Sequence, residues 1–167
     1  MKFYRFAAVA ALAFSLAACA GSVSAPVTVH ALTAEQRAGM RISDVTADAA
    51  SGVEMSDGDF AIVCDKVKAH MQEDLPGTLT ADGAYRMRIH FTRFDRGSAL
   101  ARAILIGLGQ IRIEATVDLL DASGTVAGQY KVEKQFAIGG VVGASTSVED
   151  VEDGFAKSVV EIVKMKA

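Results

Sequence analysis

The side chains with the greatest capacity for covalent or metal chemistry in this sequence are two cysteines and three histidines. The histidines lie at positions 30, 70 and 90, far apart and without an H-E-x-x-H or C-x-x-C pair, so their spacing predicts neither a metal nor a cofactor. No serine occurs in a G-x-S-x-G sequence, which would mark a nucleophile for hydrolysis. A catalytic triad stays open as an alternative, because its members need to be neighbours only in space.

Cys19 follows a segment with the order of a secretory signal peptide. Two basic residues precede an apolar run from Phe6 to Ala18, which is shorter than the roughly 20 residues that a membrane-spanning helix needs. The run ends in Leu16-Ala17-Ala18-Cys19, which resembles a bacterial lipobox. The resemblance implies cleavage before Cys19 and acylation of this cysteine, with palmitate among the acyl chains. Because Ala20 follows in place of aspartate, the resemblance also implies sorting to the outer membrane.

The rest of the chain has the composition of one globular domain. The sequence of 167 residues is 51% hydrophobic and has only 2 prolines, which excludes a disordered or low-complexity protein. A net charge of -3 argues against nucleic acid as a partner, because binding to phosphates needs clustered lysine and arginine. We predict a signal peptide over residues 1–18, the lipidated cysteine and a tether over 19–32, and a single domain over 33–167. Ordinary cleavage after Ala20 is the alternative for the first boundary.

Two apolar stripes at helical spacing predict the main helices. The first stripe predicts a helix over residues 57–73 with Ser56 as its N-cap. It comprises Phe60, Val63, Cys64, Val67 and Met71. Because Cys64 lies in the middle of this stripe, we expect a buried thiol rather than a nucleophile. The second stripe runs from Val148 to Ile162, and the capping-box spacing of Ser147 and Asp150 marks its start.

Alternation of apolar and polar residues predicts the strands. It extends over residues 85–92, 111–119 and 130–138, and a further strand is indicated around 41–48. The turn residues 121–124 predict an antiparallel hairpin between the second and third of the clear strands. We therefore expect an α+β fold, a two-layer sandwich with a mainly antiparallel sheet of three or four strands and two main helices on one face.

The water-facing side of the predicted sheet carries charges of both signs. Its expected members are Arg86, Arg88, His90, Arg112, Glu114, Asp118, Lys131 and Glu133. Opposite charges on neighbouring strands are typical of an ordinary solvated sheet face. The second hypothesis is a polar recognition face for another envelope protein or an anionic glycan, with Arg86, Arg88 and Arg112 as interaction residues.

Residues 99–109 form the most apolar stretch of the predicted domain, between two amphipathic strands. One interpretation is a short helix packed under the edge of the sheet, because large exposed apolar patches are uncommon on monomers. The alternative is a docking surface for a partner or a second copy. Its interaction residues would be Arg102, Ile104, Leu105, Ile106 and Leu108.

Three segments together resemble a known family. Residues 94–98, 102–109 and 113–124 read FDRGS, RAILIGLG and IEATVDLLDASG, and this order resembles the bacterial lipoproteins grouped as domain of unknown function 4410. The resemblance covers roughly residues 55–167. It implies a secreted α/β domain of Gram-negative envelopes and supplies no catalytic residues.

Together these patterns favour a lipoprotein on the periplasmic face of the outer membrane. We expect a non-enzymatic binding or accessory module that is attached to the membrane through its N-terminal lipid and that contacts an envelope protein. The alternative is a periplasmic hydrolase whose active site the sequence does not reveal.

Overall fold

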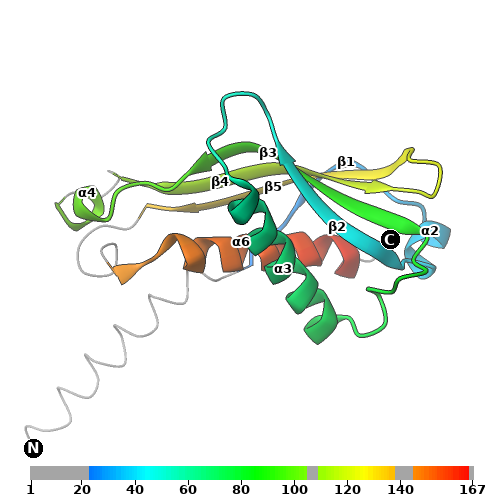
Figure 1. The fold of residues 1–167 in the computed structure, drawn as a ribbon. Helices are drawn as coiled ribbons and strands as arrows, with labels where there is room; N and C mark the ends of the chain where they lie inside the picture. Colours follow the sequence, from blue (N-terminus) through cyan, green and yellow to red (C-terminus); the bar gives the residue numbers. More distant parts are fainter. Residues whose placement is uncertain (1–22, 105–108, 138–144, 166–167) are drawn as a thin grey trace, which may run out of the picture.

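The computed structural model describes residues 23–104, 109–137 and 145–165. These residues form an α+β domain in which the two long helices lie on one face of a twisted sheet (Figure 1). Cys19 and the predicted interaction residues Leu105, Ile106 and Leu108 lie outside the described residues.

Five strands form one sheet in the described part of the chain, in the order β1-β5-β4-β3-β2. β3, β4 and β5 are antiparallel neighbours, β1 is antiparallel to β5, and β2 is parallel to β3. The strands are β1 (Val27–His30), β2 (Ile42–Ala49), β3 (Tyr85–Asp95), β4 (Ile111–Leu120) and β5 (Val126–Phe136).

The α+β class is confirmed, but the predicted three or four strands were too few. β1 lies in the stretch 19–32 that we expected to be a tether, and its four residues are all exposed, so no buried face marks it as a strand. The parallel pairing of β2 with β3 makes the sheet mixed. The pairing is parallel because the chain crosses over through the long helix α3 (Asp57–Asp74) between these two strands. Parallel neighbours require such a connection.

The long helices begin where the sequence predicts. α3 (Asp57–Asp74) is capped by Ser56, whose hydroxyl accepts a hydrogen bond from the Asp59 amide, and Ser147 caps α6 (Val148–Lys164) in the same way. Two short helices, α2 (Ala34–Ala38) and α4 (Ala99–Ile104), complete the helices of the described residues.

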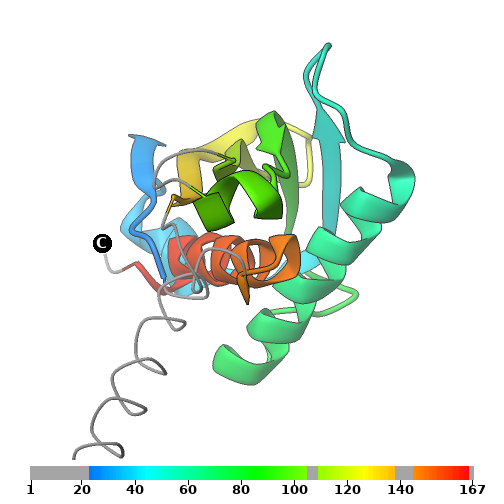
Figure 2. The same ribbon diagram turned by 90° about the vertical axis from the view of Figure 1, so that its left-hand side faces the viewer.

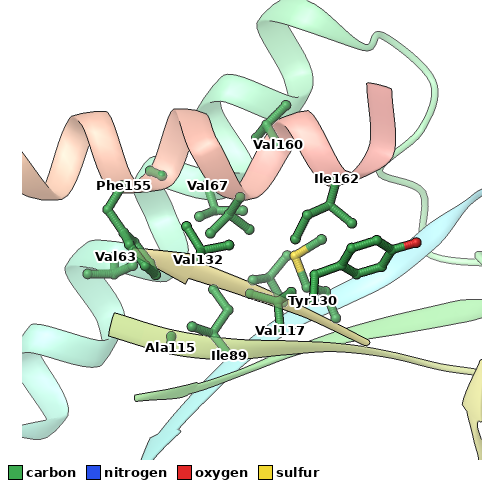
Figure 3. Close-up of a cluster of buried hydrophobic side chains, with 14 of the residues drawn as sticks. Val63, Val67, Ile89, Ala115, Val117, Tyr130, Val132, Phe155, Val160 and Ile162 are labelled. Atoms are coloured by element: carbon green, nitrogen blue, oxygen red, sulfur yellow. The ribbon is translucent and has the colours of Figure 1, made fainter. Parts of the chain in front are cut away.

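The core lies between the sheet and the two long helices (Figure 3). Phe91 from β3 and Phe155 from α6 are fully buried, and their ring centroids are 5.6 Å apart. Cys64 is buried as a free thiol, and burial raises its pKa, which fits the core position expected from its stripe. Lys134 is also buried, because it lies on the helix-facing side of β5. The other residues of this row are apolar.

A row of ion pairs joins α3 to α6 at the rim of this core. Their partners are Lys66 with Glu152 at 3.3 Å, His70 with Asp153 at 2.7 Å, and Asp74 with Lys164 at 2.7 Å. We call this row the α3–α6 seam. The α3 members recur every four residues, so they share one face of the helix.

Candidate functional site

The open face of the sheet, away from the helices, carries the charged residues that the alternation predicts there. Asp118 accepts hydrogen bonds from Arg88 Nη2 at 2.6 Å and from Gln129 Nε2 at 2.8 Å. These contacts leave the Asp118 residue only 4% exposed on a face we expected to meet water. The bond to Asp118 raises the pKa of Arg88. Arg88 therefore forms an ion pair with Asp118 on the open face.

Two further open-face residues are paired with carboxylates. Arg112 Nε lies 2.5 Å from Glu114 Oε1 and its Nη2 lies 2.9 Å from Glu133 Oε1 on the next strand. His90 Nδ1 lies 2.5 Å from Asp48 Oδ1 on β2. Ordinary cross-strand pairing thus accounts for much of this face.

The three arginines of the recognition hypothesis are not brought together. In the β3–β4 register Arg86 is opposite Leu120, whereas Arg112 is opposite Asp95. These two positions are nine residue steps apart on β3, from Arg86 to Asp95, which corresponds to about 30 Å along the strand. Arg86 is exposed near the turn at Gly124, at the other end of the hairpin from Arg112.

Arg112 belongs instead to a hollow where β3 and β4 meet the connection from β2 to α3. The hollow has a volume of about 580 Å³ and we call it the arginine hollow. It is lined by Glu54, Arg93, Phe94, Asp95, Arg96, Gly97, Gln110 and Arg112. A smaller hollow of about 230 Å³ shares four of these residues and extends along Gly52 and Val53.

The walls of the arginine hollow are held by local ion pairs. Arg93 Nε donates to Asp95 Oδ2 at 2.6 Å, and Arg96 Nη2 donates to Asp59 Oδ1 at 2.6 Å. The guanidinium of Arg96 also lies 5.1 Å from the centre of the Phe94 ring, which is cation–π distance. Arg93 and Arg96 each keep about half of their side chains exposed, at 49% and 50%.

Asp59 connects this hollow to the start of α3. One of its oxygens accepts from Arg96, and the other accepts from the Ser56 amide at 2.7 Å within the capping box. The bond from Arg96 and then that from the Ser56 backbone lower the pKa of Asp59 to about 2. The carboxylate is therefore charged at physiological pH and holds Arg96 beside the hollow.

Two glycines close the chain beside the hollow. Gly97 and Gly109 have φ of +64° and +65°, and the Ser98 amide donates to the Gly109 carbonyl at 3.1 Å. A Cβ atom at Gly97 would lie 2.2 Å from the Gly109 oxygen, and one at Gly109 would lie 2.3 Å from the Ser98 oxygen. Only glycine fits this backbone approach. We call the paired glycines the neck, and the connection that contains α4 lies beyond it.

α4 lies at the end of the sheet opposite α2 (Figure 1). Its residue Leu100 is 73% exposed, and Ala99 and Ala103 are exposed as well. The backbones of Arg102 and Ile104 belong to α4, but their side chains are not described.

No pattern in the sequence indicated Arg93, Arg96, Glu54 or Gln110 as site residues. A signal was present, because the FDRGS segment singled out for the family resemblance contains both Arg96 and the neck residue Gly97. The partner Asp59 lies 37 residues earlier, so spacing could not indicate the ion pair.

The chemistry available at the arginine hollow is ion pairing and hydrogen bonding. Among the described residues that line it there is no serine, cysteine or histidine. No group of three or more potential ligands that could hold a metal ion occurs in the described ranges. No helix within them is long and apolar enough to cross a membrane.

Comparison with known proteins agrees with the sequence resemblance. The model of the family described as domain of unknown function (DUF4410) matches residues 63–140, which confirms that resemblance. The matched segment contains β3, the neck, α4, β4 and β5. None of the curated proteins compared with the chain matches it.

Two solved structures share the fold at low sequence identity. A PelC variant from Paraburkholderia phytofirmans, solved as a dodecamer, has a TM-score of 0.54 at 11% identity and covers 80% of this chain and 92% of its own. A second PelC dodecamer from that organism has a TM-score of 0.50 at 11% identity, with coverages of 82% and 95%. A candidate lipoprotein from Caulobacter crescentus CB15 has a TM-score of 0.46 at 16% identity, with coverages of 78% and 95%.

Proposed function

We propose that this protein is a lipoprotein on the periplasmic face of the outer membrane, anchored through Cys19, and that it acts as a non-enzymatic binding or accessory module. The lipobox-like sequence before Cys19 supports the anchor. The other cysteine, Cys64, is buried in the core and is not available for lipidation.

The binding role is supported by the features of one end of the sheet, where the neck, the arginine hollow and α4 lie. Two glycines that tolerate no side chain fix this end, and it presents exposed arginines and the exposed Leu100. Exposed ion pairs contribute only about 0–1 kcal/mol each, so their arginines can exchange partners at little cost. A partner surface with carboxylates and an apolar centre fits such an end.

A second copy of the chain is the first partner to test. PelC has the same fold and was solved as a dodecamer. A similar assembly here would place many copies of a lipid-anchored domain side by side. Another envelope protein is the partner if the chain does not associate with itself.

A hydrolase would need a nucleophile, a base and oxyanion donors in one place. Two histidines in the described residues are paired with carboxylates, His70 with Asp153 in the seam and His90 with Asp48, and the second pair lies on the open face of the sheet. Hydrolysis of a periplasmic substrate that His90→Ala abolishes would favour the enzyme.

Replacement of Cys19 tests the anchor. In the exporting cell, Cys19→Ser should abolish labelling with a palmitate analogue and should release the domain from membranes, whereas Cys64→Ser should change neither. Labelling that persists in Cys19→Ser would contradict the lipoprotein proposal.

Replacement of Leu100 tests the binding end. Leu100→Asp should reduce cross-linking between copies, or capture of an envelope partner from solubilised membranes, by at least about tenfold. Ile62→Asp is the matched control, because Ile62 is also an exposed aliphatic residue but lies on α3. Equal capture by both variants and the wild type, with folding retained, would contradict a role for this end.

A further inference from the structure

The exposed apolar residues of the domain are concentrated next to its N-terminal end. Of the six large hydrophobic residues exposed within the described ranges, Val23, Val27 and Val29 lie within seven residues and are 51%, 63% and 51% exposed. We call residues 23–30 the N-terminal edge. Figure 2 shows it along the side of the molecule opposite α3.

β1 has an outer side that another molecule can cover. It is the outermost strand of the sheet, and among the described residues no strand pairs with its outer side. Exposed edge strands usually carry charges or prolines that prevent association. β1 is protected in part by its length of four residues, by the bulge between Thr28 and His30 and by Pro26 just before it, but its sequence VTVH contains no lysine or carboxylate.

The chain is attached to the body of the domain very soon after Cys19. The Ser24 amide donates to the hydroxyl of Ser158, a fully buried residue of α6, at 2.7 Å. Five residues lead from Cys19 to Ser24, and even fully extended they reach only about 18 Å. A domain of this size has a radius of gyration of about 15 Å. A bilayer that holds the acyl chains therefore cannot lie farther from Ser24 than about the radius of the domain.

We infer that the N-terminal edge rests on the headgroup region of the bilayer that holds the lipid anchor. This inference relies on the proposed lipidation of Cys19. The edge is the part of the domain nearest to the anchor, and its valines provide the apolar contact. Exposed Lys131, which is opposite Val27 in the β1–β5 register, provides a cation for lipid phosphates.

The depth of the contact follows from the backbone of β1. Its outward N–H and C=O groups need hydrogen-bond partners, which hydrocarbon does not offer and which water and headgroups do. The edge therefore lies at the headgroup level and does not enter the acyl layer. With β1 on the membrane, α3 on the opposite side of the domain faces the periplasm.

The test uses the full lipidated chain, reconstituted in vesicles of phosphatidylethanolamine and phosphatidylglycerol. A polarity-sensitive fluorophore is attached to Val27→Cys and, as the matched control, to Ile62→Cys on α3, both in a Cys64→Ala background. Quenching by a spin label on the lipid headgroup should be at least about threefold greater at position 27 than at position 62. Val29→Cys provides a second reporter if Val27→Cys does not fold.

The outcomes separate this inference from the proposed function. Chains that float with vesicles but show equal quenching at both positions would overturn the membrane contact and leave the anchor in place. Chains that do not float with vesicles would overturn both. The fluorophore at position 27 could instead report a less polar environment as the number of copies per vesicle grows, without quenching by the headgroup label. This result would assign the edge to a second copy and would also overturn the membrane contact.

Discussion

The α3–α6 seam and the arginine hollow both pair cations with carboxylates, but the surroundings of the pairs differ. In the seam, Lys66 and Glu152 bridge two helices at the rim of the apolar core, and Glu152 is nearly buried. At the hollow, Arg93 and Arg96 keep half of their side chains in solvent while they pair with neighbouring carboxylates.

The exposure of each pair determines what the pair can do. A buried carboxylate that loses its partner is left as an uncompensated charge, so removing Lys66 from its pair with the buried Glu152 should destabilise the fold. An exposed arginine that leaves its carboxylate finds water in its place, so the pairs of the hollow can rearrange when a partner binds. The buried pair of the seam therefore has a structural role, whereas the half-exposed arginines of the hollow are the ones that we propose for binding.

The largest expected effect breaks the neck on which the hollow depends. Gly97→Ala should lower the free energy of unfolding by about 3 kcal/mol, because the new Cβ would collide with backbone oxygens at a positive φ. Gly124→Ala is the control with positive φ but open space, since its nearest neighbour is Arg86 Nη2 at 3.9 Å. It should cost about 1 kcal/mol. Equal decreases in the free energy of unfolding for the two variants, measured in urea, would mean that the neck accommodates a Cβ atom without strain.

A smaller effect is expected when the seam loses its cation. Lys66→Met should destabilise the domain by about 2 kcal/mol, less than a fully buried pair would because Lys66 is partly exposed. Glu152→Gln removes the buried charge itself and should be nearly neutral.

The pH dependence of this seam pair has a definite sign. Burial is the largest cause that raises the pKa of Glu152 above its ordinary value, and Lys66 opposes it. A carboxyl with a raised pKa costs stability above that pKa and ceases to do so as the pH falls through it. The loss in Lys66→Met should therefore be smaller near pH 4.5, the ordinary carboxyl value, than at pH 7 in urea titrations, and a loss that stays constant would contradict this account.

The sequence predicted the parts of the fold that repeat a pattern. The stripes of α3 and α6 and the capping boxes at Ser56 and Ser147 correspond to long stretches in which each residue adds to the signal. β1 did not produce such a signal, because four exposed residues on a sheet edge bury no face. The parallel partner of β2 also depends on a helical crossover, which alternation within a strand does not encode.

The candidate site was harder to predict for a similar reason. Alternation located Arg112 and Glu114 on one face correctly, but the arginine hollow combines strand ends with a connection far away in the sequence. Arg96 acquires its role through Asp59 at the start of α3 and through the sharp turn at Gly97. These relations are tertiary, and only glycine placement gave a local indication of them.

The smallest expected effect concerns the carboxylate that links hollow and helix. Asp59→Asn keeps a side-chain oxygen for the α3 cap but removes the charge that holds Arg96, and it should cost about 1 kcal/mol because the pair is at the surface. Asp150→Asn is the matched control, since Asp150 occupies the same capping position on α6. It should cost less, and the difference between the two losses measures the bond to Arg96.

The pKa of Asp59 gives the pH range of that difference. Its value of about 2 lies below the ordinary 3.8, so the carboxylate stabilises the fold above about pH 4, and this contribution is lost as the pH falls toward 2. Unfolding experiments at pH 7 and at pH 2.5 should therefore show the wild type and Asp59→Asn converging in acid. If the two stay equally far apart at both values, Arg96 is held by something other than the Asp59 charge, and the distinction between exchangeable pairs at the hollow and the buried Lys66–Glu152 pair in the seam fails for the Arg96–Asp59 pair.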